Sequence, residues 1–101
     1  MSDCRFSVVI PSLGGACLQK TLLSLESSTA LPDEIIVCIP EDIRFDDKVY
    51  AAPNLRFLKT TVRGQVGQRA LGFKEASNKL VLQLDDDVEV SPGCILSLLN
   101  S

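Results

Sequence analysis

Histidine is absent from this 101-residue sequence, and cysteine occurs only four times. A structural zinc site combines cysteine and histidine ligands or uses closely spaced cysteine pairs. Cys4, Cys17, Cys38 and Cys94 contain no Cys-x-x-Cys pair, which argues against such a site. We expect four reduced thiols, most of them in the core, as in a protein of a reducing compartment.

Long apolar runs and a basic excess are missing too. No run approaches the roughly 18 residues of a membrane span, and residues 1–5 lack the basic start and apolar stretch of a signal peptide. The net charge of −3 provides no basic patch for a phosphate backbone. We therefore expect a cytoplasmic protein without a transmembrane segment and without a nucleic-acid partner.

The composition is otherwise that of an ordinary soluble domain. The sequence is 46% hydrophobic and 23% charged, which argues against disorder, coiled coil and low complexity. A length of 101 residues is typical of one domain with an adequate but small core. We expect a single compact unit over residues 1–101.

Short apolar runs alternate with segments of helical periodicity. Runs rich in β-branched residues predict buried strands, and two of these runs are closed by Pro11 and Pro40. The predicted strands are Phe6 to Ile10, Glu34 to Ile39, Leu55 to Lys59 and Leu80 to Leu84. The predicted helices are Cys17 to Ser27, one whose start is flanked by Gly64 and Gly67 and which continues through Ala76, and a last one from Pro92. Residues 41–53 are expected to form a loop or one short helix.

This order of elements predicts an α/β fold with a mostly parallel sheet flanked by helices. In such sheets the ligand lies outside the carboxyl ends of the strands. The segments to inspect are therefore those after Ile10, Ile39 and Leu84.

Three consecutive aspartates follow the last predicted strand. If the strand stays extended, Asp85 and Asp87 project to the same side while Asp86 faces away. Two converging carboxylates repel each other, and Mg²⁺ or Mn²⁺ with oxygen ligands would offset the repulsion. Such an ion keeps open positions for substrate phosphates and can neutralise a diphosphate leaving group.

Other interpretations of the acidic run stay open at this point. The triplet can equally be solvated charge that ends a strand and caps the following helix. A calcium loop is disfavoured, since Val90 stands where a sharp-turn glycine is needed. A phosphoaspartyl hydrolase also uses two alternating aspartates, the first as nucleophile, but that pair normally follows the first strand, not the fourth.

Five segments in the right order resemble the opening of the family-two glycosyltransferases of the GT-A fold, over nearly the entire chain. They are Ser7-Val8-Val9-Ile10-Pro11-Ser12, Leu18 through Leu25, Pro32-Asp33-Glu34-Ile35-Ile36-Val37, Gly67-Gln68-Arg69-Ala70-Leu71-Gly72 with Glu75-Ala76-Ser77, and Leu82-Gln83-Leu84-Asp85-Asp86-Asp87 with Pro92 at the usual distance. The resemblance implies a truncated, Rossmann-like domain whose nucleotide-sugar-binding half is present and whose acceptor half is absent.

The resemblance also implies an activity. Such an enzyme transfers a sugar, of the hexosyl type, from a nucleoside-diphosphate sugar to an acceptor hydroxyl, with a divalent metal. A UDP-sugar is the default donor, a glycan or glycolipid is the acceptor, and surface glycan biosynthesis is the setting, peripheral to the membrane in the full-length protein. The general base is expected beyond residue 101, so we expect weak or absent activity of this chain alone.

Site residues follow from the same resemblance. Asp87 would ligate the metal, Asp85 would hold the ribose or the metal shell, and Asp86 belongs to the same donor-binding set. Pro11 and Ser12 would border the base and ribose. Arg69 would lie near the diphosphate or an acidic residue of the pocket, a surface ion pair being the alternative.

The segment after the second predicted strand departs from the family pattern. The family usually has two aspartates there, one contacting the base, whereas this chain has Glu41 and Asp42 after Pro40. Glu41 either takes over a hydrogen bond to uracil or is a solvated loop charge. The alternative function is a non-catalytic α/β nucleotide-binding or interaction module, and an exposed sheet edge would favour pairing into a homo-oligomer.

Overall fold

The computed structural model describes residues 5–15, 17–27, 31–43, 54–61, 64–86, 93 and 95. In chain order the elements are β1 (Phe6–Pro11), α1 (Cys17–Glu26), β2 (Glu34–Pro40), β3 (Leu55–Thr60), α2 (Gln65–Glu75) and β4 (Leu80–Gln83). Apart from residues 93 and 95, the predicted last helix lies outside the described residues, as does most of the segment 41–53. Within the described ranges, no helix has the length and apolar character needed to cross a membrane.

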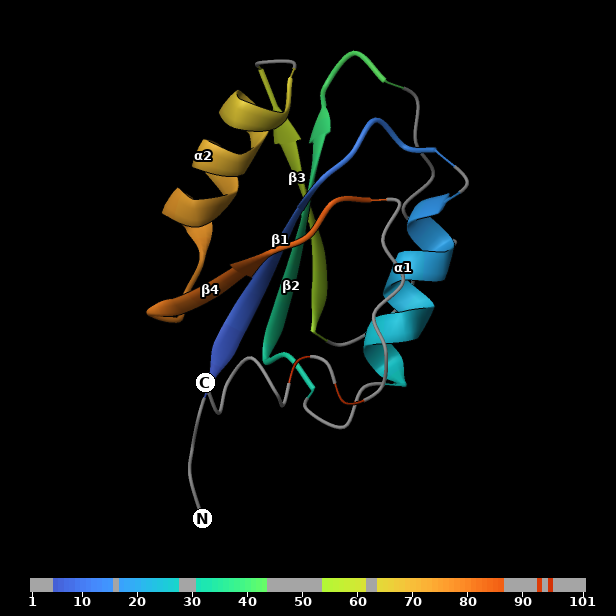
Figure 1. Cartoon of the computed structure of the whole chain (residues 1–101). Helices are drawn as coiled ribbons and strands as arrows, with labels where there is room; N and C mark the ends of the chain where they lie inside the picture. Colours follow the sequence, from blue (N-terminus) through green and yellow to red (C-terminus); the bar gives the residue numbers. More distant parts are fainter. Residues whose placement is uncertain are drawn as a thin grey trace.

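The four strands form one sheet in the order β3-β2-β1-β4, and every neighbouring pair is parallel (Figure 1). In the centre of the sheet, Val9 of β1 lies opposite Ile36 of β2 and Gln83 of β4. Helix α1 lies on one side of the sheet and α2 on the other (Figure 1). The predicted α/β architecture, a parallel sheet flanked by helices, is confirmed.

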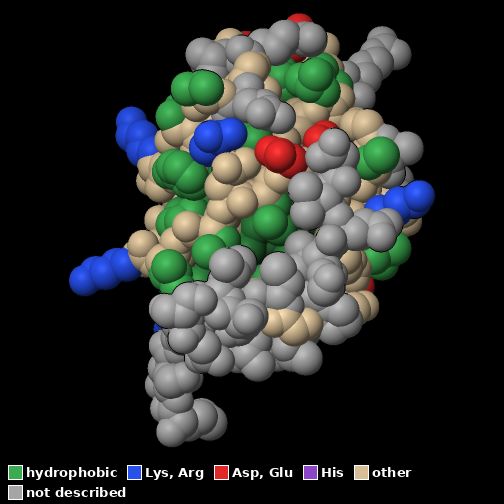
Figure 2. Space-filling model, viewed as in Figure 1, with side chains coloured by type: hydrophobic (Ala, Val, Ile, Leu, Met, Phe, Trp, Pro, Cys, Tyr) green, Lys and Arg blue, Asp and Glu red, His purple; other side chains and the backbone are tan. Residues whose placement is uncertain are grey.

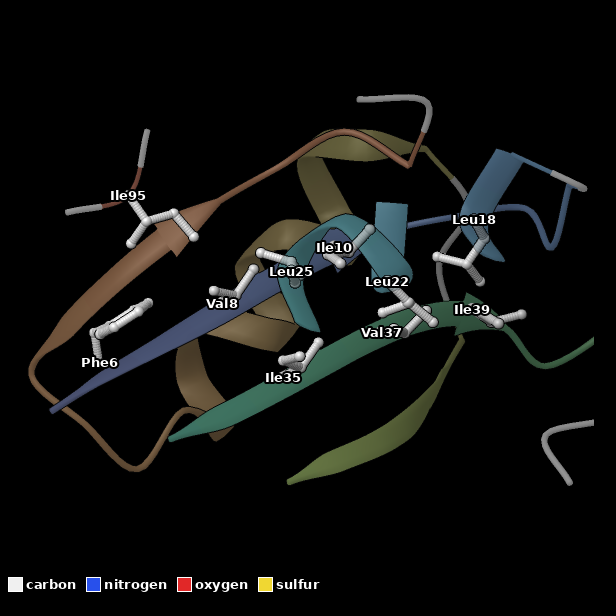
Figure 3. Close-up of a cluster of buried hydrophobic side chains, with 10 residues drawn as sticks. All are labelled: Phe6, Val8, Ile10, Leu18, Leu22, Leu25, Ile35, Val37, Ile39 and Ile95. Atoms are coloured by element: carbon white, nitrogen blue, oxygen red, sulfur yellow. The ribbon is translucent and has the colours of Figure 1, made fainter. Parts of the chain in front are cut away.

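The face of the sheet toward α1 carries the larger hydrophobic cluster (Figure 3). Alternate residues of the central strands, such as Val8 and Val37, point to the side where Leu22 of α1 packs. The buried members are Phe6, Val8, Ile10, Leu18, Leu22, Leu25, Ile35, Val37, Ile39 and Ile95. Because helices cover both faces, β1 is buried at every residue and β2 at every residue after Glu34, as their largely apolar sequences predicted.

Helix α2 packs closely on the opposite face, against Val9, Ile36 and Cys38. Gly72 makes this approach possible, since a Cβ atom there would lie 2.5 Å from Val9 Cγ1 and 2.7 Å from Cys38 Sγ. Both distances are too short for a real Cβ contact. The backbone of α2 therefore rests directly on β1 and β2.

A polar cluster around Glu34 connects the carboxyl end of α2 with the amino ends of β1, β2 and β3. Glu34 accepts hydrogen bonds from Ser7 Oγ (2.9 Å), Ser77 N (2.9 Å) and Ser77 Oγ (3.2 Å), and its Oε2 lies 3.3 Å from Arg56 Nε. Arg56 also donates to the carbonyl of Glu75. Desolvation raises the pKa of Glu34, but the hydrogen bonds from Ser77 and Ser7 and the charge of Arg56 outweigh it, so this pKa lies below its usual value.

Candidate functional site

The strand order locates the candidate site at the carboxyl ends of β1 and β4. From β1 the chain crosses by α1 to β2 on one side, whereas β4 lies on the other side of β1. In a parallel α/β sheet such a reversal is the usual place for a ligand. Ser12 follows β1 and Asp85 and Asp86 follow β4, so the structure brings these three predicted site residues to the same point.

A hydrogen bond joins the two strand ends directly. Ser12 Oγ donates to Asp86 Oδ2 at 2.8 Å, and the same hydroxyl accepts from Gly14 N at 2.9 Å. Thr21 of α1, which is fully buried, donates its hydroxyl to the carbonyl oxygen of Asp86 at 3.0 Å. Both the side chain and the backbone of Asp86 are therefore fixed by residues far away in the sequence.

The aspartate segment differs from the extended geometry considered above. Strand β4 ends at Gln83, and after a last ladder bond from Leu84 N to Val9 O the chain turns at Asp86. The carboxylate of Asp86 points toward Ser12. Asp85 is half-buried and its Oδ1 accepts from Gln83 Nε2 at 3.2 Å. Asp87 lies outside the described residues.

A buried glutamine on α2 lies beneath this contact. Gln68 is 2% exposed, and its Nε2 donates to the carbonyl oxygens of Ser12 (2.9 Å) and Cys38 (2.7 Å). Its Oε1 accepts from Gly64 N at 3.1 Å. Sequence reasoning missed Gln68 as a site residue, although it shares the sheet-facing side of α2 with Gly72, four residues on.

Arg69 directly follows Gln68 and is half-buried. Its Nε is shielded from solvent and has no hydrogen-bond partner among the described residues. An unpaired buried donor costs about 1–3 kcal/mol, so this nitrogen is suited to an acceptor supplied from outside the described residues. Acidic and basic side chains lie near one another in the upper half of the face shown in Figure 2, which has the orientation of Figure 1.

Pro11 and Glu41 differ in exposure. Pro11 is buried as the last residue of β1, in register with Cys38 of β2. Glu41 follows β2 and is exposed, while its backbone N donates to Thr60 O at 2.8 Å. The structure therefore places Glu41 at the carboxyl end of β2, the strand next to the one that carries Ser12.

The described residues provide few ligands for a metal. No three acidic, cysteine or histidine side chains gather within the described ranges. A Mg²⁺ ion bound with substrate phosphates needs only one or two protein carboxylates, because waters and phosphate oxygens complete its shell. The half-buried Asp85 fits that limited requirement, with a carboxylate at the carboxyl end of β4.

These features define a parallel α/β domain with hydrogen-bonded polar side chains at the carboxyl ends of β1 and β4. The family model described as glycosyl transferase family 2 matches residues 7–101. The chain therefore belongs to this family, and the resemblance seen in the sequence is confirmed. A comparison with curated protein sequences gives no match.

Solved structures share the fold. The TarS protein of S. aureus superposes with a TM-score of 0.73 at 21% identity, covering 95% of this chain and 19% of TarS. TarS 1–349 in complex with UDP gives 0.75 at 19% identity, with coverage of 95% and 31%. A 4-diphosphocytidyl-2C-methyl-D-erythritol synthase gives 0.60 at 22% identity, with coverage of 81% and 46%. At these identities the likeness establishes the fold alone, and the chain spans less than a third of either TarS structure.

Proposed function

We propose that this chain is the donor-binding part of a metal-dependent glycosyltransferase, which moves a sugar from a nucleoside-diphosphate sugar to an acceptor hydroxyl. The observation that carries the proposal is the hydrogen bond between Ser12 and Asp86, because it builds a fixed polar edge at the reversal of strand order. Membership of glycosyl transferase family 2 supports the reaction class. The TarS structure with UDP supports a uridine nucleotide as the donor's carrier.

Asp85 and Asp87 are the proposed ligands of a Mn²⁺ or Mg²⁺ ion. When bound, the ion would neutralise the diphosphate leaving group. Asp86 is the proposed support of this pair, since its carboxylate is engaged by Ser12 and its carbonyl by Thr21. A segment held at both its side chain and its backbone presents neighbouring carboxylates in a fixed position.

Arg69 is the proposed contact of the diphosphate. Its guanidinium carries a buried Nε that has no partner within the part of the chain that the structure describes. A phosphate oxygen is an acceptor that suits the planar fork of arginine. Pro11 and Ser12 would border the base and ribose, and the exposed Glu41 would accept a hydrogen bond from uracil. The acceptor is proposed to be a glycan or glycolipid of the cell surface, handled on the cytoplasmic side. The general base is proposed to lie outside these 101 residues.

Calorimetric titration of UDP and GDP tests the proposal. We expect the protein to bind UDP with Mn²⁺ and to lose binding with EDTA or in Asp87→Ala. Arg69→Met should raise the dissociation constant about tenfold to a hundredfold, since a hydrogen bond to a charged group is worth about 1.5–3 kcal/mol.

Matched variants separate the site from a general charge effect. Lys74→Met removes an exposed cation from the same helix, and Glu75→Gln removes an exposed carboxylate at the far end of α2. Both should bind UDP like the unchanged protein. Absence of nucleotide binding by folded protein, or equal weakening by Lys74→Met and Arg69→Met, would contradict the proposal.

A further inference from the structure

Gln68 has a buried polar side chain to which the proposed function assigns no role. Its carboxamide uses both N–H groups and its oxygen, on Ser12 O, Cys38 O and Gly64 N respectively. Because two of the three partners are carbonyl oxygens, which only accept, the orientation of the amide is fixed by chemistry. Gln68 is thus fully satisfied and held in a single arrangement.

The three partners belong to three different segments. Ser12 lies in the turn after β1, Cys38 lies near the end of β2, and Gly64 directly precedes α2. The carbonyl of Cys38 also accepts from Ser12 N at 2.9 Å, so Gln68 completes a compact group of hydrogen bonds around the two strand ends. In a buried setting such a satisfied network favours one geometry, since any departure leaves a polar group unpaired.

The network continues from Gln68 toward the aspartates. Gln68 holds the backbone oxygen of Ser12, and the hydroxyl of Ser12 holds the carboxylate of Asp86. A shift of the Ser12 backbone would move its hydroxyl and therefore the turn that carries Asp85 and Asp86. The side chain of Gln68 is itself buried, so it acts on this edge through Ser12 and not by contact with a ligand.

We propose that Gln68 is a positioning residue of the donor site, which fixes Ser12 so that Ser12 can hold Asp86. The inference rests on the proposed function for its effect on nucleotide binding. By this inference the buried face of α2 contributes to ligand affinity in addition to its role in core packing.

Gln68→Met is the main test, because methionine has a similar length and fills the space without hydrogen bonds. We expect the dissociation constant of UDP with Mn²⁺ to rise about 10- to 100-fold, the range typical of residues that support ligand-contacting groups. The titration is done well below the melting temperature of the variant, so that loss of folded protein does not enter.

Asn78→Ala is the matched control. Asn78 also donates a side-chain amide hydrogen bond, to Ser7 Oγ at 3.0 Å, but at the amino ends of the strands. We expect this variant to lose thermal stability and to keep the UDP affinity of the unchanged protein. If reduced stability alone weakened UDP binding, both Gln68→Met and Asn78→Ala would bind UDP more weakly.

A double-mutant cycle identifies the route of the effect. If Gln68 acts through Ser12, Gln68→Met with Ser12→Ala should bind UDP about as weakly as Ser12→Ala alone, because coupled residues are not additive. Unchanged UDP affinity in Gln68→Met, or losses in the double variant that multiply, would overturn the inference.

Amide hydrogen exchange keeps the inference testable without a nucleotide. The N–H of Gly14 donates to Ser12 Oγ, so its protection reports the position of that hydroxyl. We expect faster exchange at Gly14 in Gln68→Met and unchanged exchange in Asn78→Ala. If the unchanged protein binds no UDP, the proposed function fails, but the positioning role of Gln68 can still be tested by exchange. Equal exchange rates at Gly14 in Gln68→Met and in the unchanged protein would overturn the positioning role.

Discussion

Replacement of Gly72 by alanine should destabilise the protein although alanine favours helices. The added Cβ would lie 2.5 Å from Val9 Cγ1 and 2.7 Å from Cys38 Sγ, whereas ordinary contacts begin at 3.4 Å. Both neighbours are fully buried in the central strands, where close packing leaves little room for a side chain to shift. Relief therefore requires α2 to move away from the sheet by about 0.9 Å, the shortfall at Val9.

The magnitude follows from two opposing terms. Overpacking of a buried contact costs about 1–3 kcal/mol, and replacing glycine by alanine inside a helix returns about 1 kcal/mol. The difference is a net loss of about 0–2 kcal/mol in the free energy of unfolding. We expect the upper half of this range, about 1–2 kcal/mol, because α2 cannot move without disturbing Gln68 on the same face. For a domain of this size that corresponds to a fall of about 5–10 °C in melting temperature.

Thermal unfolding followed by circular dichroism measures the effect. Gly15→Ala is the control, since a Cβ there meets no atom within 4 Å and its melting temperature should stay close to the original. Gly72→Ala should also bind UDP more weakly, because the shift of α2 carries Gln68 and Arg69 with it. A melting temperature of Gly72→Ala equal to or above that of the unchanged protein would refute the close packing of α2 on Val9 and Cys38.

Two further predictions use the ionisable groups of the sheet. The pKa of Glu34 is lowered from 4.5 in the folded protein, so its charge stabilises the fold above pH 4.5, and this stability is lost as the pH falls through the lower folded pKa. The melting temperature of Glu34→Gln should therefore fall less steeply with acid than that of the unchanged protein. An equal slope for the two proteins would contradict this. Burial raises the pKa of the Cys38 thiol to about 11. Iodoacetamide at pH 8 should therefore label the exposed Cys17 and leave Cys38 unlabelled, which peptide mass spectrometry can measure. Prompt labelling of Cys38 in the folded protein would argue against its burial.

Local patterns in the sequence were sufficient to predict most of the fold. The two central strands are largely apolar and almost entirely buried, because helices cover both faces of the sheet. The prolines that close the apolar runs, Pro11 and Pro40, are the last residues of β1 and β2. The helical spacing of Leu18, Leu22 and Leu25 correctly predicted the buried side of α1. These features depend on burial, which hydrophobic periodicity records directly.

The direction of the aspartates was not accessible in the same way. Alternation along an extended strand places Asp86 away from its two neighbours, but the chain turns at Asp86, where Ser12 and Thr21 provide partners. Those partners lie 74 and 65 residues earlier in the chain. A choice between strand and turn that depends on two distant hydroxyl groups leaves no local periodic signal.

Gln68 shows the same limit for a polar residue in the core. Glutamine is usually exposed, and one glutamine in an amphipathic helix carries little information until its face is known. The face is set by Gly72, which brings α2 close enough to β1 and β2 for the carboxamide to reach the carbonyls of Ser12 and Cys38. A larger residue at Gly72 would separate these groups, so the small residue in the core and the polar contact at the site depend on each other. The affinity of the site for a ligand should therefore respond to packing of α2 as well as to the residues that face the ligand.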